Sequence, residues 1–337
     1  MTGKQRVLSV LAGGASDRLP VLPIVHTGLA AHVGVPLGRY FTDAEAMAEV
    51  IRRGYELFGY DGVQLTLGVV AEPEALGAHV VQPPDAAPLL KERLLADLDR
   101  LSDLRRRDVA AGGRIPMYNA AVRRVVDEIG SEAFVISTLR GPLNIASQLR
   151  GVEDMLIDMI ERPDVAARLL EFATEVAIRV AQAARSSGAD AVMFGEAACS
   201  PNFIAPAMYR NLVQPWHARM VSEVRRAGWR FVGLHVCGGI LPILDDLIAT
   251  GADLLDVDYQ VPVREAIRAG GGRVALRGNL NPTELLLQGT PEEVLRETQA
   301  LCVAAAGARW IVGSGCDVPP GTPAANLHAM VRVVKGA

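Results

Sequence analysis

The sequence predicts an α/β fold, a (β/α)8 barrel in which eight strands alternate with helices around one sheet. Short apolar runs rich in β-branched residues recur along the 337 residues, and segments of helical period separate most of them. Eight such runs over this length favour a barrel over a doubly wound sheet. The turn after the first run, "VHTGLAAHVG", also lacks the glycine-rich fingerprint of a nucleotide-binding sheet.

The strand candidates extend from near the N-terminus to near the C-terminus. In chain order they cover 20–28, 62–68, 133–140, 191–196, 230–236, 254–259, 273–279 and 309–315. Several of the intervening helices have a proline near the start and a glycine at the close, as helix ends often do. The clearest amphipathic helices are predicted at 43–59, 206–228, 241–251 and 291–307.

One connection is too long for a plain barrel. The stretch 69–132 follows the second strand and predicts an insertion within the barrel. Its charge-rich part, 91–108, predicts a helix with a solvated face. No repeat or linker divides the chain, so a single domain over 1–337 is expected.

The composition is that of an ordinary soluble enzyme. Half of the residues are hydrophobic, 21% are charged and the net charge is −4, which argues against a nucleic-acid partner. No run of about 18 apolar residues predicts a membrane span, and no secretory segment is visible, so a cytoplasmic location is expected. Four cysteines are too few for a disulfide framework, and Cys199 and Cys302 are expected to be inert core thiols.

Polar residues at the strand ends carry the predicted chemistry, because the carboxyl ends of barrel strands face a common mouth. His235 and Cys237, in "GLHVCGGI", are two positions apart at the end of a strand and therefore point the same way. Cys316, in "GSGCDVPPGTP", lies just past the eighth strand. Together the three predict a zinc site with an open fourth position.

Other strand-end residues surround this predicted site. Glu196 is expected to be either a weak fourth ligand that substrate displaces or a hydrogen-bonded carboxylate of the mouth. Asp258 and Asn279 are expected to orient His235 or to contact substrate. His26, at the end of the first strand, is expected to line the mouth.

These motifs resemble a known family. The segments "LHVCGG", "LRGNLNPTELLLQGTPEEV" and "GSGCDVPPGTPAANLHAM" resemble the methylcobamide:coenzyme M methyltransferases and related corrinoid methyltransferases, which share the uroporphyrinogen decarboxylase fold. The resemblance extends to "RGPLNIASQLRGVEDML" and "CSPNFIAPAMYRNLVQPW", and so covers most of the chain. It implies a barrel of the uroporphyrinogen decarboxylase type with zinc on His235, Cys237 and Cys316.

The sequence also departs from part of that superfamily. The decarboxylases carry an arginine-rich "RQAGR" signature that grips substrate carboxylates, whereas the matching region here, "VLPIVHTGLAAHVG", contains no arginine. A porphyrin with eight carboxylates needs such cations, so porphyrin decarboxylation is not expected.

The resemblance implies a zinc-dependent transfer of a methyl group between a methylcorrinoid and a small acceptor. A thiol such as coenzyme M suits the site, because zinc removes the proton of a bound thiol. Tetrahydrofolate is an alternative acceptor, and Asp258 and Asn279 would then hold its pterin. Transfer of the methyl group to the corrinoid protein is another alternative. A non-catalytic metal-binding barrel is an alternative of another class.

A partner protein is also expected. The chain has no "DxHxxG" corrinoid-binding signature. Methylcobalamin is therefore expected as a co-substrate, free or on a separate corrinoid carrier protein that docks over the mouth, with 69–132 as a candidate contact. The oligomeric state is left open.

Overall fold

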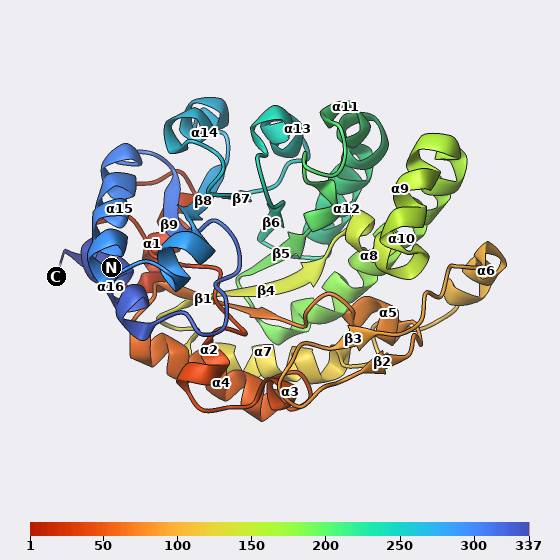
Figure 1. Cartoon of the computed structure of the whole chain (residues 1–337), viewed down its shortest axis with the longest axis horizontal. Helices are drawn as coiled ribbons and strands as arrows, with labels where there is room; N and C mark the ends of the chain where they lie inside the picture. Colours follow the sequence, from red (N-terminus) through yellow and green to blue (C-terminus); the bar gives the residue numbers. More distant parts are fainter. Residues whose placement is uncertain (337) are drawn as a thin grey trace.

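A curled sheet of seven parallel strands forms the centre of the protein, with helices around its outer side (Figure 1). The computed structural model describes residues 1–336, and Ala337 lies outside them. The strand order is β1-β4-β5-β6-β7-β8-β9. These strands are β1 (Gly62–Thr66), β4 (Phe134–Arg140), β5 (Ala191–Gly195), β6 (Phe231–His235), β7 (Leu254–Val257), β8 (Ala275–Leu280) and β9 (Trp310–Ser314). Seven of the eight predicted strands are thus confirmed.

The first predicted strand, 20–28, is wrong in its extent. It forms one isolated parallel bridge, between Val21 and Val312 of β9. On its other side the carbonyl of Val21 accepts a hydrogen bond of 2.8 Å from the amide of Asp61, just before β1. Pro20 and Pro23 have no N–H to donate, which explains why no longer ladder forms. The segment still lies between β9 and β1, where it completes a (β/α)8 barrel with one irregular member.

The segments predicted as amphipathic helices are helical. Asp43 caps α4 (Ala44–Phe58), and Gly59 closes that helix at a φ of 70°. Thr290 and Glu293 form a capping box at the start of α15 (Pro291–Ala304). The other helices and helical turns are α1 (Gly3–Leu11), α2 (Leu29–His32), α3 (Leu37–Tyr40), α8 (Pro142–Arg150), α9 (Val152–Glu161), α10 (Pro163–Ala184), η2 (Arg185–Ser187), η3 (Ala197–Cys199), α11 (Pro206–Met208), η4 (Tyr209–Val213), α12 (Gln214–Arg226), η5 (Leu241–Ile243), α13 (Leu244–Ala249), α14 (Val263–Gly270), η6 (Pro282–Leu287) and α16 (Ala324–Lys335).

The stretch 69–132 contains a two-stranded sheet and several helices. They are α5 (Ala71–Ala75), β2 (Val80–Val81), β3 (Leu89–Leu90), η1 (Leu98–Arg100), α6 (Leu101–Leu104) and α7 (Ile115–Ile129). Because α7 packs against α4, it belongs to the helical layer of the barrel, and the additional material precedes it. The helix predicted over 91–108 is wrong in its extent, since the side chain of Asp97 accepts a hydrogen bond from the amide of Asp99 and starts a short turn there. The single-domain organisation stays a prediction.

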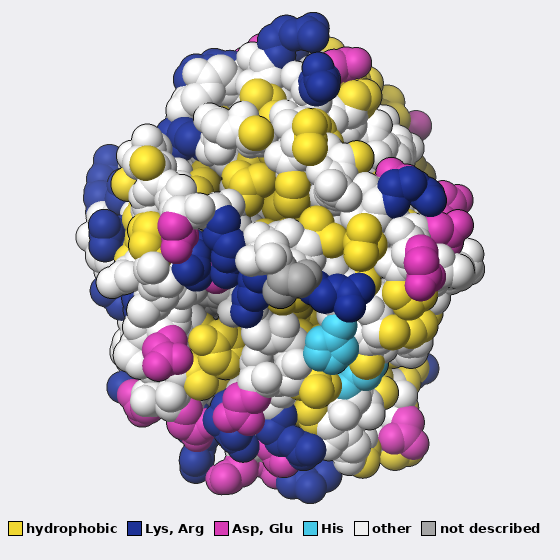
Figure 2. Space-filling view, turned by 90° about the vertical axis from the view of Figure 1, so that its left-hand side faces the viewer, with side chains coloured by type: hydrophobic (Ala, Val, Ile, Leu, Met, Phe, Trp, Pro, Cys, Tyr) yellow, Lys and Arg dark blue, Asp and Glu magenta, His cyan; other side chains and the backbone are white. Residues whose placement is uncertain are grey.

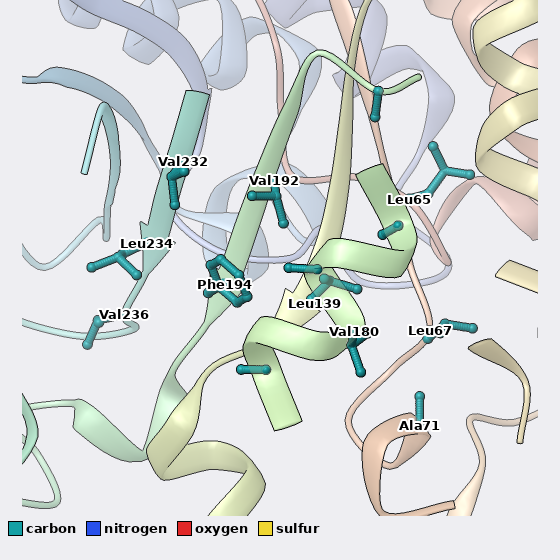
Figure 3. Close-up of a cluster of buried hydrophobic side chains, with 14 of the residues drawn as sticks. Leu65, Leu67, Ala71, Leu139, Val180, Val192, Phe194, Val232, Leu234 and Val236 are labelled. Atoms are coloured by element: carbon teal, nitrogen blue, oxygen red, sulfur yellow. The ribbon is translucent and has the colours of Figure 1, made fainter. Parts of the chain in front are cut away.

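Two hydrophobic clusters lie on opposite faces of the sheet, because side chains alternate along each strand. Phe134 and Ile136 of β4 meet Val10 of α1 inside the barrel, so α1 closes the amino-terminal end. Residues on the opposite face, such as Val192 and Leu234, belong to the cluster beneath the outer helices (Figure 3). Apolar side chains therefore fill the lower barrel and leave its mouth for polar groups.

The surface carries charges of both signs. Figure 2 shows the face around the chain termini, where basic, acidic and apolar side chains are interspersed. Among residues 1–336, none of the helices has the length and apolar character that a membrane span requires.

Candidate metal centre

Three soft ligands converge at the mouth of the barrel. His235 ends β6, Cys237 follows two positions later, and Cys316 follows the end of β9. The Nε2 atom of His235 lies 3.2 Å from Sγ of Cys237 and 3.6 Å from Sγ of Cys316. The two sulfur atoms are 3.5 Å apart. The chain thus brings together, from strands 79 positions apart, the three residues that the sequence singled out.

This donor set fits zinc. Tetrahedral zinc has Zn–S distances of about 2.3 Å and Zn–N distances of about 2.0–2.1 Å, which place its ligand atoms about 3.5–3.8 Å from one another. The separations of 3.2–3.6 Å among the three atoms are close to those values. Two thiols with one imidazole are also a set that zinc prefers over hard cations such as Mg²⁺.

A buried ion pair holds the imidazole of His235. Its Nδ1 lies 2.9 Å from Oδ2 of Asp256 on β7. Arg277 on β8 donates from Nε and Nη2 to both oxygens of Asp256, each at 2.7 Å. Asp256 is 1% exposed and Arg277 is fully buried, so the pair is shielded from water. This contact directs Nε2 of His235 toward the two sulfur atoms, as outer partners of metal ligands commonly do.

The pKa values of the three groups are strongly shifted. Burial lowers the pKa of His235, but its contacts with Asp256 and Cys316 raise it more, to about 10. The hydrogen bond from Cys237 lowers the pKa of Cys316 despite burial, and His235 lowers it further, to about 4. The same contact between the thiols raises the pKa of Cys237. In the metal-free protein, the triad of His235, Cys237 and Cys316 therefore favours a thiolate on Cys316 beside an imidazolium on His235.

Asp258 and Asn279 organise loops of the mouth. Asp258 accepts hydrogen bonds from the amides of Gly238 and Gln260, at 2.9 and 3.0 Å. Asn279 donates to the carbonyl of Val261 at 2.7 Å and to that of Asp258 at 3.3 Å. It is Asp256, and neither of these two residues, that contacts the imidazole of His235. The strand-end pattern selects Asp258 and misses Asp256, which lies two positions earlier in "LLDVDY", on β7. Strand alternation does not say which of two carboxylates at this spacing reaches His235.

Glu196 is held away from the triad by other partners. Its Oε1 accepts a hydrogen bond of 3.0 Å from the amide of Leu143, and its Oε2 one of 2.8 Å from that of Asn144, at the start of α8. His217 contacts Oε1 at 2.8 Å. The ligand atoms of Glu196 cluster with those of Cys199 and His217 instead of with the triad. The geometry of the carboxylate therefore gives no support to a role as fourth zinc ligand and agrees with the alternative, a hydrogen-bonded carboxylate.

Two cysteines outside the triad have different surroundings. Cys199 is fully buried, and burial raises the pKa of its thiol. Cys302 lies on α15, where partial burial also raises the pKa of its thiol. Neither thiol belongs to the lining of the cavity beside the triad. Cys199 lies beside Glu196 because one local turn, η3, joins them: the amide of Cys199 donates to the carbonyl of Glu196 at 2.9 Å.

A cavity of about 290 Å³ opens beside the triad. His26, Glu196 and Asp317 line it together with the triad, whereas Asp258 and Asn279 do not. Burial lowers the pKa of His26 to about 3, which keeps this imidazole neutral. The cavity therefore places the neutral imidazole of His26 and the three ligand side chains around one small space.

Comparisons with known proteins agree with this geometry. A family model described as uroporphyrinogen decarboxylase (URO-D) matches residues 2–337. The chain is 28% identical to a methylcobamide:CoM methyltransferase of Methanosarcina barkeri, over 98% of this chain and 96% of that protein. It is also 28% identical to a uroporphyrinogen decarboxylase of Streptomyces avermitilis, over 91% of this chain and 85% of that protein.

The fold has a similar counterpart among solved structures. A methyltransferase from Methanosarcina mazei superposes with a TM-score of 0.91 at 25% sequence identity, over 100% of this chain and 99% of that chain. The resemblance inferred from the strand-end motifs is thereby confirmed over the whole barrel. The chain belongs to the uroporphyrinogen decarboxylase (URO-D) family.

Proposed function

We propose that this protein is a zinc-dependent methyltransferase that moves a methyl group between a methylcorrinoid and a small thiol. The convergence of His235, Cys237 and Cys316 within 3.2–3.6 Å of one another carries the proposal. The relatives named as methylcobamide:CoM and methylated-thiol–coenzyme M methyltransferases support the reaction class. Three ligands leave zinc one open position, which is typical of catalytic rather than structural zinc.

In this proposal the residues of the chain bind and orient the zinc and the substrate. Bound zinc would lower the pKa of the substrate thiol that occupies its open position. His235, Cys237 and Cys316 hold the metal. Asp256 and Arg277 fix the imidazole of His235 from behind. Two thiolate ligands keep the residual positive charge of the site small, so the substrate sulfur stays nucleophilic. The sulfur–carbon bond then forms as the cobalt–carbon bond breaks, and the electron pair of that bond stays on the corrinoid.

The cavity favours a thiol over tetrahydrofolate as the acceptor. Its volume of about 290 Å³ is just below that of typical ligand pockets, which have about 300–1,000 Å³. Asp258 and Asn279, the side chains expected to hold a pterin, are bonded to the backbone and do not line the cavity. Both observations support a small acceptor.

A methylcorrinoid must reach the same mouth. We propose that it arrives on a separate corrinoid carrier protein, because the chain contains no "DxHxxG" signature. The loops after β1 border the cavity through Val69, Ala87 and Pro88, so the stretch 69–132 is in a position to contact such a carrier.

The test is a methylcobalamin assay with coenzyme M, homocysteine and tetrahydrofolate offered separately, with the cob(I)alamin spectrum followed over time. We expect demethylation with a thiol, at least about 100-fold faster than with His235→Ala, because loss of outer partners alone costs about 10–100-fold. Cys302→Ser, outside the cavity, is the matched control and should retain the activity. If purified wild-type protein binds zinc but demethylates with no acceptor, the proposed reaction is wrong and a non-catalytic metal-binding barrel becomes the better account.

A further inference from the structure

The two thiols of the candidate metal centre lie close enough to react with each other. Sγ of Cys237 and Sγ of Cys316 are 3.5 Å apart, at the edge of the range of about 3–3.5 Å from which well-aligned atoms form a bond. A disulfide has a sulfur–sulfur distance of about 2.05 Å, so a shift of about 1.5 Å, shared between two side chains, would join them. The proposed methyl transfer uses these sulfur atoms as metal ligands only and leaves this second reaction unassigned.

Both sulfur atoms can be reached by a small molecule. Cys237 and Cys316 are partly exposed, and both line the cavity of about 290 Å³. Cys199 is fully buried, and Cys302 lies on α15, outside this cavity. A reagent that enters the cavity therefore meets Cys237 and Cys316 and neither of the other two thiols.

The two cysteines reach this position from strands that are not neighbours in the sheet. Cys237 follows β6 and Cys316 follows β9, and two strands lie between them. Nε2 of His235 lies 3.2 Å from the first sulfur and 3.6 Å from the second, so one imidazole contacts both. A disulfide here would link two distant loops of the mouth and would use both sulfur ligands of the metal centre.

We propose that Cys237 and Cys316 are a site of thiol–disulfide exchange in the metal-free protein, where a small disulfide RSSR converts them into an intramolecular disulfide. One cysteine thiolate attacks a sulfur of RSSR, which breaks its S–S bond and releases the first RSH after protonation. The second cysteine attacks the mixed disulfide, forms the Cys237–Cys316 bond and releases the second RSH. Two electrons pass from the protein to RSSR and the two cysteine protons end on the two RSH, so no further oxidant is required.

Zinc and this disulfide exclude each other. Zinc binds cysteines as thiolates, and a disulfide leaves neither sulfur as a thiolate. Bound zinc in turn holds its ligand atoms about 3.5–3.8 Å apart around the metal, so the sulfur–sulfur bond can form only after the metal leaves. The metal centre would therefore close when small disulfides accumulate and reopen when excess thiol reduces it. This inference does not depend on methyl transfer.

The test follows the thiols of the full chain, as purified with zinc and after removal of zinc by a chelator. Both forms are incubated with 2-hydroxyethyl disulfide, a small neutral RSSR, and the remaining thiols are titrated in denaturant. For the metal-free wild type we expect the four thiols to fall to two, with a loss of two hydrogen atoms by mass and a cross-linked peptide pair that contains Cys237 and Cys316. Zinc at about 100 times its dissociation constant should slow this loss about 100-fold, because only the metal-free form reacts.

Single substitutions separate an intramolecular disulfide from oxidation of isolated thiols. Cys237→Ser and Cys316→Ser each lack the second thiol, so each should keep one 2-mercaptoethanol adduct on the remaining cysteine. The wild type should accumulate no adduct, because its second step is intramolecular and therefore fast. Cys302→Ser, outside the cavity, is the matched control and should form the same disulfide as the wild type. The thermal midpoint of each metal-free protein is measured, so that an unfolded variant is recognised.

Zinc binding gives a second readout that is independent of turnover. The oxidised wild type should bind no zinc until dithiothreitol reduces it, and should then regain one zinc per chain. The proposal is overturned if the metal-free protein keeps four thiols, if the disulfide joins any other pair, or if zinc leaves the rate unchanged. Disulfide formation without methyl transfer would remove the proposed function alone, whereas methyl transfer without disulfide formation would remove this inference alone.

Discussion

Two clusters of the same residue types lie near the mouth of the barrel. His235, Cys237 and Cys316 form one, and Glu196, Cys199 and His217 form the other; in each, the ligand atoms lie within 4.8 Å of one another. The first cluster is partly exposed to a cavity, whereas all three residues of the second are fully buried. Residue types and proximity therefore do not separate a metal site from a structural cluster.

The hydrogen-bond partners of the two histidines distinguish one cluster from the other. In the buried cluster, His217 uses both ring nitrogens, with Nε2 on Glu196 and Nδ1 3.0 Å from the hydroxyl of Tyr209. In the open cluster, Asp256 occupies only Nδ1 of His235, and the remaining nitrogen faces the two thiols. Donor atoms without other partners, next to a space that ligands can enter, distinguish the candidate metal centre.

The largest difference in zinc affinity between the two clusters is expected when one thiol is removed from each. We expect Cys316→Ser to lower zinc affinity by more than about 100-fold, because loss of outer partners alone costs about 10–100-fold. Cys199→Ser should retain one zinc per chain. Metal analysis after dialysis measures both, and a Cys316→Ser protein that keeps stoichiometric zinc would contradict the assignment of the open cluster.

Acid should release zinc from the open cluster. With His235 at a pKa of about 10, the pKa of Cys237 raised and Cys316 at about 4, the metal-free site at pH 7 carries protons on His235 and Cys237. Zinc must displace both, so its affinity should fall by about 100-fold for each unit of decreasing pH near neutrality. Calorimetry in buffers of different ionisation enthalpy measures the protons released, and a value near zero would contradict the charge distribution.

The partner of His235 should have a smaller effect than a ligand. Asp256→Asn keeps the shape of the side chain but removes the charge that holds the imidazole, and we expect zinc affinity to fall by about 10–100-fold. Asp258→Asn, which touches only backbone amides, should change the affinity less. Competition with a chromogenic chelator measures both, and equal affinities for the two variants would refute the distinct position of Asp256.

The smallest effect on zinc is expected in the buried cluster. Glu196→Gln leaves the amide of Asn144 or of Leu143 poorly paired, so it should lower the free energy of unfolding by about 1–3 kcal/mol without changing zinc affinity. Urea denaturation measures the first quantity and metal analysis the second. Loss of zinc without loss of stability would instead identify Glu196 as a fourth ligand.

The site was more predictable than its surroundings. The position of Cys237 beside His235 follows from the alternation of side chains along a strand. The approach of Cys316 follows from barrel topology, which brings the carboxyl ends of distant strands to one mouth. The choice between Asp256 and Asp258 depends on the depth of each carboxylate in the barrel, which a period of two does not encode.

The fold was predictable to a similar degree. Apolar runs located seven strands within a few residues, and closing glycines such as Gly59 located helix ends. The first segment has the composition of a strand, but Pro20 and Pro23 prevent a continuous ladder, so it contributes only one bridge. Residues 91–108 have the charge pattern of a helix, yet only 98–104 are helical, and these helical turns begin where the side chain of Asp97 accepts a hydrogen bond from the amide of Asp99.

The central claim is that His235, Cys237 and Cys316 hold one zinc whose open position takes the substrate thiol. Zinc K-edge X-ray absorption of the purified protein tests it directly. We predict two sulfur ligands at about 2.3 Å together with a nitrogen ligand, and a third sulfur when coenzyme M is added. Fewer than two sulfurs in the free protein, or a sulfur count that does not change when the thiol binds, would contradict the claim.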